Sequence, residues 1–432
     1  MEIRFVNPGA RWVFLIGVLL GATTLTVLAG KNWVAEEWAL SSQPGNWLRA
    51  TRLEPGNAEY WFRLGRYRQL DFESSDLPLA ITYYRRAVAI DPHSAIYWMD
   101  LASAYEMVGD LAGAQKAFGA AELAYPISGE VAWRYGNFLL RHGILSQGFF
   151  EIRRAIATDF QLAGAAVIRC LRVSGNIERV LDEALPAHAD VYLEALDSLV
   201  AEREIDAALA VWRRLAELHP SFEMRRAFPL LDALIGQDRI DEAQRVWQQA
   251  LNLAGQRAGL SSGGSLVWDG GFEGNLVNGG FGWRQLPVAE ASFQLDTTTF
   301  HSGSRSLRIS FDGGSNLDFS HLVQYVPVEP GTRYRFAAYL RTEEISTDSG
   351  IRFWISDPHH PGAVSFLTED LVGTHPWSLL ETEVTTGLQT RLLAIWLRRL
   401  PSRKFDNKLK GTVWIDDVSL TPVLQDAGRP AP

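Results

Sequence analysis

Small and aromatic residues recur at a period of about 34 residues between positions 44 and 254, and no other feature limits the fold so strongly. The clearest unit runs from a tryptophan to a proline: Trp98, Leu101, Ala102, Tyr105, Ala114, Phe118, Ala121 and Pro126. Ala80, Tyr84 and Pro92 lie 34 residues before the matching alanine, phenylalanine and proline. A unit of this length cannot bury its apolar face alone, so successive units must stack on one another.

Two later units repeat even more closely. Their matching positions are 35 residues apart: Ile205, Asp206, Ala208 and Trp212 correspond to Ile240, Asp241, Ala243 and Trp247. The pattern resembles that of tetratricopeptide repeat proteins over residues 31–253, about half of the chain. The resemblance implies an all-α solenoid of about six helical hairpins that binds a protein or peptide. The stretch 160–186 follows the pattern poorly, and no recurring set of basic and asparagine residues indicates which peptide would bind.

Residues 12–30 form an uncharged apolar run near the N-terminus. As a helix, these 19 residues would span about 28 Å, close to the thickness of a bilayer core. Arg4 and Arg11 precede the run, so the positive-inside rule places residues 1–11 in the cytoplasm and the rest of the chain outside. We therefore predict a single-pass transmembrane signal anchor in the inner (cytoplasmic) membrane, with the bulk of the chain periplasmic or otherwise extracytoplasmic. The alternatives are a signal peptide cleaved near Ala29 and a buried core helix.

The hydrophobic period changes from helical to strand-like after residues 254–265, a glycine- and serine-rich stretch that predicts a flexible joint. Short alternating runs separated by turn residues follow, at 306–311, 321–328, 333–342, 351–356, 390–399 and 412–420. This pattern predicts an all-β antiparallel jelly-roll sandwich over residues 266–424. We expect a disordered tail at 425–432.

Several segments of this region, taken in order, resemble the jelly-roll (galactose-binding-like) carbohydrate-binding modules of bacterial polysaccharide-degrading enzymes. They are GGFEG at 270–274, Gly282-Trp283, HSGSRSLRI at 301–309, VPVEPGTRYRFAAYLRT at 326–342 and GTVWIDDVSL at 411–420. The resemblance covers the whole predicted sandwich and implies polysaccharide binding. The same fold also serves as an accessory domain that binds no sugar, so the fold alone does not establish binding.

The resemblance also implies a structural calcium ion between the opening FE segment and the closing DD strand. Glu273, Asp416 and Asp417 would supply carboxylate oxygens, which calcium prefers, together with carbonyls of the HSGSRS turn. Alternatively, these carboxylates only accept hydrogen bonds from turn amides. No other cofactor is predicted.

Alternate residues of the predicted strands point away from the core. On this reasoning Phe353 and Ile395 face inward, and the outward set is Tyr339, Arg341, Arg352, Trp354, Trp396 and Arg398. We interpret these six residues as one exposed face. Aromatic rings stack on sugars and arginines bind hydroxyls or carboxylates, so the face predicts a polysaccharide ligand, acidic polysaccharides included. The alternative is that this face packs on the helical array or under a loop.

The remaining chemistry of the sequence argues for binding rather than catalysis. A net charge of −9 is unsuited to a nucleic-acid partner. The single cysteine, Cys170, lies in an apolar stretch and is predicted to be buried, while His359 and His360 lie in a turn and are predicted to be solvated. No paired-carboxylate, phosphate-loop, nucleophile-elbow or metalloprotease motif occurs, so we predict no enzymatic activity.

The leading functional prediction is a membrane-anchored envelope scaffold that binds a protein through its repeats and a polysaccharide through its sandwich, in exopolysaccharide assembly or export. The runner-up is a purely structural assembly factor whose sandwich binds no sugar. A polysaccharide-processing enzyme of unrecognised type is a weaker third.

Overall fold

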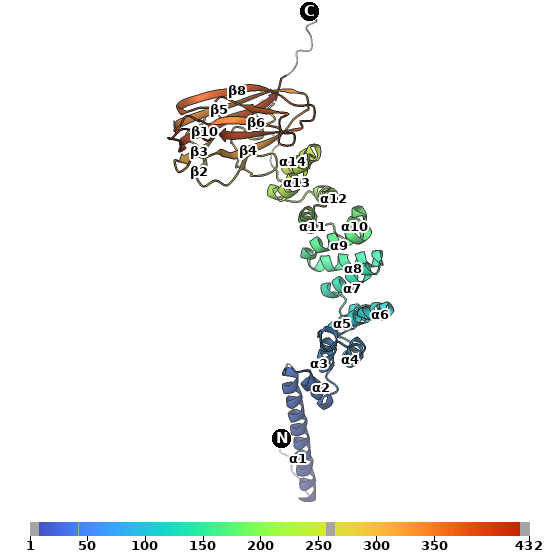
Figure 1. The fold of residues 1–432 in the computed structure, drawn as a ribbon. Coiled ribbons are helices and arrows are strands. Elements are labelled where there is room, and N and C mark those ends of the chain that lie inside the picture. Colours follow the sequence, from blue (N-terminus) through green and yellow to red (C-terminus); the bar gives the residue numbers. More distant parts are fainter. Residues whose placement is uncertain (1–7, 42, 256–263, 424–432) are drawn as a thin grey trace, which may run out of the picture. The chain divides into compact units, whose positions relative to one another are not determined.

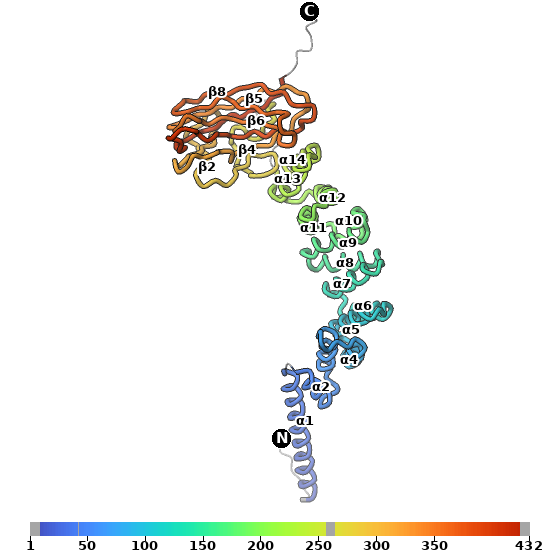
Figure 2. The backbone as a smooth tube through the Cα atoms, in the orientation of Figure 1, coloured from blue at the N-terminus to red at the C-terminus, as the bar shows by residue number. Residues whose placement is uncertain are grey.

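The computed structural model describes residues 8–41, 43–255 and 264–423 (Figure 1). The first seven residues, most of the predicted joint and the predicted tail lie outside these ranges. The chain divides into two compact units, Met1–Pro186 and Ala187–Pro432. Figure 2 traces the backbone, with helices first and strands last. The predicted class, an apolar N-terminal helix and a helical solenoid followed by a β-sandwich, is confirmed.

Helix α1 (Pro8–Leu40) contains the predicted apolar run and continues ten residues beyond it. By length and composition alone it is able to cross a membrane, a test that a signal sequence also passes. Its last turns pack on α2 (Pro44–Leu53), where Ala35 and Ala39 are buried. The Arg63 guanidinium also donates a hydrogen bond to the Ala39 carbonyl at 2.8 Å. The helix therefore passes unbroken through the predicted cleavage position and ends as part of the first helical layer.

The other helices of the first unit pair in chain order as hairpins. Their bounds are α3 (Ala58–Leu70), α4 (Leu77–Ile90), α5 (Ala95–Met107), α6 (Leu111–Ala124), α7 (Gly129–Arg141), α8 (Leu145–Thr158), α9 (Ala163–Ser174) and α10 (Ile177–Glu183). The side chains of Asp76, Asp110 and Ser128 cap α4, α6 and α7 by accepting a hydrogen bond from a first-turn amide. The poorly matching stretch begins with a 3-10 turn and ends in a helix of only seven residues, α10, which explains its weak pattern.

Small residues and tryptophans act in the repeats as the sequence pattern predicts. A Cβ atom on Gly65 would lie 2.7 Å from the ring of Tyr84, so glycine permits the close approach of α3 and α4. Trp61 and Trp98 each donate an indole hydrogen bond to the carbonyl of the proline six residues earlier, at 3.0 and 2.9 Å. The repeat is thus visible in contacts as well as in spacing. Cys170 is buried, as predicted, and burial raises the pKa of its thiol to about 12.

Four helices open the second unit: α11 (Ala189–Ala201), α12 (Ile205–Glu217), α13 (Phe228–Gly236) and α14 (Ile240–Leu253). The two tryptophans that the sequence predicts as core, Trp212 and Trp247, are both buried. The last two helices form a hairpin, which we call the α13–α14 hairpin.

The sandwich consists of two antiparallel sheets, each with five strands in the described part of the chain. The first sheet has the order β1-β4-β9-β6-β7: β1 (Arg284–Gln285), β4 (Phe319–Pro327), β9 (Leu392–Arg399), β6 (Arg352–Ser356) and β7 (Ser365–Leu367). The second has the order β2-β3-β10-β5-β8: β2 (Ala291–Asp296), β3 (Ser306–Asp312), β10 (Lys410–Pro422), β5 (Arg333–Ile345) and β8 (Gly373–Thr385). The apolar core lies between the sheets and includes Ile309, Leu340, Phe353 and Ile395.

The α13–α14 hairpin contacts the sandwich within the second unit. The Trp247 ring meets Trp268 and Phe281 edge-on, with centroid distances of 5.7 and 5.9 Å. Gly280 has a φ of +53°, and a Cβ atom there would lie 2.4 Å from the Trp247 indole. Only glycine therefore fits beside this tryptophan.

Candidate functional site

Two tryptophans stack on the outer face of the first sheet. Trp354 of β6 and Trp396 of β9 are directly paired across the strands, with ring centroids 6.1 Å apart and planes at 26°. Both side chains are half-buried, and the Trp354 indole donates a hydrogen bond to the Ser365 hydroxyl at 3.1 Å. The neighbouring residues Phe353 and Ile395 face the core, as strand alternation predicts. The pair thus forms an ordered aromatic surface that is open to solvent on one side.

Arg352 and Arg398 lie beside this tryptophan pair, as predicted, but each already has an acidic partner. Arg352 pairs with Asp370 at 2.6 Å, and Arg398 pairs with Asp318. The positive charge of the face is therefore largely neutralised within the protein. This arrangement favours a neutral sugar over an acidic one at the tryptophan pair.

Tyr339 and Arg341 lie on the other sheet, so the prediction that all six residues share one face is wrong. They belong to β5, whose neighbours are β10 and β8. The Tyr339 ring stacks on His301 at 3.6 Å, and the Arg341 guanidinium lies 5.5 Å from the centre of the Trp414 ring. Strand alternation shows that a residue points outward but not which sheet its strand joins.

Part of the outer face of the first sheet is covered. Val323 and Ala394 occupy outward positions of β4 and β9, yet both are buried. Around them, two arginines of the sandwich form ion pairs with aspartates of the α13–α14 hairpin, Arg284 with Asp232 and Arg391 with Asp241. The His359 ring lies 2.9 Å from Asp238 in the turn of the hairpin. The sequence leaves open the alternative that this face packs on the helices. The structure shows such packing on the β1–β4 side of the face.

The predicted solvation does not hold for His359, whose side chain is 20% exposed and lies 2.9 Å from Asp238, whereas the His360 side chain is 34% exposed. The backbone amides of both histidines donate hydrogen bonds to Asp357. The turn is held by these contacts, and no sequence motif marks them because Asp238 lies in another domain of the predicted architecture.

The predicted calcium ligands gather around the HSGSRS turn and act as hydrogen-bond acceptors. Glu273 accepts from the Ser304 amide at 2.8 Å and from the Ser304 hydroxyl. Asp416 accepts from the amides of His301 and Ser302 at 2.8 and 3.1 Å. Asp417 has a φ of +50° at a bulge of β10, which turns its carboxylate toward the same turn.

In this arrangement the carboxylates accept hydrogen bonds from N–H and O–H groups of the turn, as the alternative to calcium binding expects. Among the described residues, no group of three or more His, Cys, Asp or Glu side chains is placed to hold a metal ion. Burial raises the pKa of Asp416 to about 6, with repulsion from Asp417 adding to the effect. Burial alone would also raise the pKa of Glu273, but its hydrogen bonds from Ser304 and Arg305 hold it below its ordinary value.

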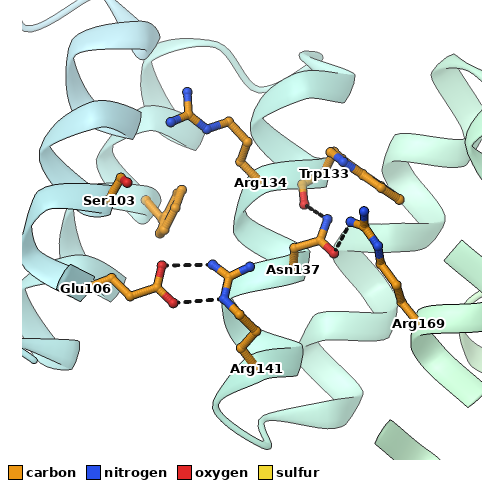
Figure 3. A pocket seen from close by; sticks show the side chains of 8 residues that line it. Ser103, Glu106, Trp133, Arg134, Asn137, Arg141 and Arg169 are labelled. Atoms are coloured by element: carbon orange, nitrogen blue, oxygen red, sulfur yellow. Dashed lines mark hydrogen bonds and ion pairs between the residues drawn. The ribbon is translucent and has the colours of Figure 1, made fainter. Parts of the chain in front are cut away.

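A pocket of about 250 Å³ lies on the first helices of three successive hairpins (Figure 3). Its lining comes from α5, α6, α7 and α9: Ser103, Glu106, Phe118, Trp133, Arg134, Asn137, Arg141 and Arg169. We call it the α5–α9 pocket. No residue pattern noted in the sequence points to this site, although polar residues at the repeat spacing were an available signal: the bonded pair Glu106–Arg141 is 35 residues apart.

Comparison with known proteins gives likenesses of fold at low identity. No family model and no curated protein matches the chain. Over the strands it is similar to the CBM22-1–GH10 modules of Clostridium thermocellum xylanase 10B complexed with xylohexaose (14% identity, 37% of this chain and 29% of that one, TM-score 0.27). It is also similar there to TmCBM61 in complex with β-1,4-galactotriose (18% identity, 37% and 100%, TM-score 0.26). Over the helices it is similar to YrrB, a tetratricopeptide protein with an unusual peptide-binding site (13% identity, 48% and 92%, TM-score 0.23).

The chain is thus similar to tetratricopeptide repeat proteins in its helices and to carbohydrate-binding modules in its strands, as the residue patterns predict. It spans less than a third of the xylanase fragment.

The buried carboxyl of Asp416 predicts a pH-dependent stability. Because its pKa rises from 3.8 to about 6 on folding, the folded chain binds this proton more tightly than the unfolded chain does. The stabilising contribution is complete below about pH 4 and is lost as the pH rises through 6. Relative to Asp416→Asn, which cannot ionise, the native chain should lose about 1–3 kcal/mol of unfolding free energy between pH 4 and 7.

Urea unfolding of both chains at several pH values, with a chelator present, measures this difference. A pH-independent difference would contradict the assignment. If calcium binds the ionised carboxylates, added calcium should restore the lost stability at pH 7, and an unchanged midpoint would rule the calcium site out.

Proposed function

We propose that this protein is a non-catalytic, membrane-anchored scaffold of the cell envelope, whose helical repeats bind a protein partner and whose sandwich binds a polysaccharide. The stacked Trp354–Trp396 pair is the observation that carries the polysaccharide part. Two half-exposed indole rings with their planes at 26°, one of them held by a hydrogen bond, match the apolar faces of consecutive sugar rings. A role in exopolysaccharide assembly or export would place such a surface next to its ligand.

The proposed location follows from α1 and the charges around it. Its apolar span would cross the inner membrane, with the N-terminal arginines on the cytoplasmic side. Because α1 continues into contact with α2, an uncleaved anchor would hold the first repeat within about 15 Å of the membrane, the length of ten helical residues.

Replacing Trp354 by alanine should weaken polysaccharide binding by about tenfold, because it removes one of two stacking rings. Trp396→Ala should have a similar effect. The measurement is affinity electrophoresis of the full chain, in a detergent without a sugar head group, through gels containing β-glucan, galactan or the uronate polymer alginate. The largest retardation is expected in a neutral polymer, since Arg352 and Arg398 are already paired.

Trp377→Ala is the matched control, because Trp377 is a half-buried tryptophan on β8 in the other sheet. It should leave retardation unchanged. A loss of retardation in this variant but not in Trp354→Ala would move the sugar site to the face that carries Tyr339. Absence of retardation in all gels would reject polysaccharide binding.

The second candidate function is a structural brace that binds no sugar. The covered positions Val323 and Ala394, with the two ion pairs to the α13–α14 hairpin, favour it, because part of the outer face of the first sheet already serves an internal contact. The gel experiment separates the two functions, since a brace predicts no retardation and no effect of either tryptophan substitution.

A further inference from the structure

We propose that the α5–α9 pocket binds a carboxylate of an extended acidic peptide segment, with Arg169 as its main contact. This inference rests on the proposed function of the repeats as a protein-binding array and specifies the chemistry of the partner. It also predicts where on the array that partner binds.

The lining of the α5–α9 pocket carries a surplus of positive charge. The lining of the pocket contains Arg134, Arg141 and Arg169 but only one acidic residue, Glu106, in a chain whose net charge is −9. A local positive surplus in an acidic protein attracts an anionic ligand and disfavours a cationic one.

Two of these three arginines are already paired with carboxylates. Arg141 binds Glu106 through two hydrogen bonds, at 3.0 and 2.8 Å, and Arg134 pairs with Asp100 at 2.8 Å. Both carboxylates of this region are therefore occupied. Among the residues that the structure describes, no aspartate or glutamate forms an ion pair with Arg169. The positive surplus of the pocket is thus concentrated on this one side chain.

Neutral contacts hold Arg169 in place. Its guanidinium lies 4.8 Å from the centre of the Trp133 ring and donates a hydrogen bond to Asn137 Oδ1 at 2.7 Å. Asn137 is fixed in turn, because its amide donates to the Trp133 carbonyl at 2.7 Å. Figure 3 shows Arg169 reaching from α9 toward Asn137 on α7. One guanidinium nitrogen is bonded to Asn137, and the others remain exposed for a carboxylate, which arginine binds bidentately.

A second pocket of the array shows the contrasting arrangement. It is lined by Arg239, Asp206 and Glu242, among others, and there Arg239 binds both carboxylates at once. Its lining also includes Arg213 and Arg245, so it has three arginines against two carboxylates, whereas the α5–α9 pocket has three arginines against one. The larger positive surplus therefore distinguishes the α5–α9 pocket from this second pocket.

Size and lining favour a peptide over a folded partner. A volume of about 250 Å³ accommodates one or two side chains, and the apolar rings of Phe118 and Trp133 flank the arginines. An extended segment places one acidic side chain, or its C-terminal carboxylate, next to Arg169 and a neighbouring apolar group beside the rings.

The test is a fluorescence-anisotropy titration of the full chain in detergent with the labelled peptide Ala-Glu-Leu-Glu-Ala-Glu. Matched peptides have glutamine in place of glutamate, or an amidated C-terminus. Arg169→Ala should weaken binding of the acidic peptide by about tenfold. Arg169→Lys should weaken it by less, because lysine keeps the charge but lacks the planar guanidinium that binds a carboxylate through two hydrogen bonds. Arg86→Ala, an exposed arginine of α4 outside the pocket, should change nothing.

Binding of the glutamine peptide as tightly as the acidic one would overturn the proposal, as would equal binding by Arg169→Ala. Competition by an oligouronate stronger than by the peptide would show that the carboxylate belongs to a sugar acid, which also overturns it. Loss of binding on amidation alone would place the contact at the C-terminal carboxylate and support it. A photo-crosslinker placed at Ser103 tests protein binding by the array independently of the peptide. If it forms adducts with a protein in the envelope while the acidic peptide does not bind, protein binding by the repeats is retained and only the carboxylate chemistry is rejected.

Discussion

Replacing Trp247 by alanine is expected to lower the unfolding free energy of the second unit by about 3–5 kcal/mol, as for other large buried aromatics. The indole is 4% exposed and lies between the helices and the sandwich, against Trp268 and Phe281. Gly280 also leaves no room for repacking without a shift, since its backbone lies directly against the ring. The substitution should therefore loosen both sides of this contact.

Native-state hydrogen exchange of the full chain measures the effect by segment. In Trp247→Ala, faster exchange is expected in α14 and also in residues 266–284. The control Trp212→Ala removes an equally buried tryptophan that packs on Phe222, so its effect should remain within the helices. Unchanged exchange of residues 266–284 in Trp247→Ala would show that the hairpin and the sandwich do not stabilise each other.

Replacing Arg399 by alanine should destabilise the sandwich by about 3–5 kcal/mol, because it leaves several buried acceptors without a donor. Arg399 ends β9 and is fully buried. Its guanidinium donates to the carbonyls of Leu317, Ser349 and Asn407 and to the side chains of Asn316 and Thr347. Burial lowers its pKa from the ordinary value.

Urea unfolding of the full chain gives the loss of stability directly. Arg399→Lys is the informative second variant, since lysine keeps the charge but has one nitrogen in place of three. It should recover only part of the loss. The neighbouring Arg398→Ala should cost less, about 1–2 kcal/mol, because its partner Asp318 is 55% exposed, although the carbonyls of Phe319 and Arg399 also lose this donor. Similar values for the two alanine variants would contradict this account of the buried arginine.

These contacts bear on how the proposed scaffold would work. A sandwich that packs on the α13–α14 hairpin holds its tryptophan pair in a defined position relative to that hairpin. Polysaccharide bound at Trp354 and Trp396 would then be held by a surface that is fixed to the helices rather than attached through a free joint. The peptide chemistry proposed for the α5–α9 pocket belongs to the other unit and is tested separately.

Much of the architecture follows from sequence because it depends on local periodicity. The recurrence of Trp98, Ala102 and Phe118 predicts stacked helical hairpins, since small and aromatic residues at that spacing must share one core. Strand alternation likewise assigns Phe353 and Ile395 to the core and Trp354 and Trp396 to the outside, and the structure agrees. A period specifies which face of an element is apolar, and nothing distant along the chain changes it.

Only the tertiary structure decides which outward faces meet. It places Tyr339 and Arg341 on the opposite sheet from Trp354, although all are outward in their strands. It also pairs Arg391 with Asp241, 150 residues away, beside the covered part of the outer face of the first sheet. Such contacts depend on strand order and helix docking across long sequence separations, and local residue patterns do not record them. The sequence by itself therefore determined the parts of this protein and the inward or outward direction of their side chains, whereas tertiary packing decided which of those side chains form a site.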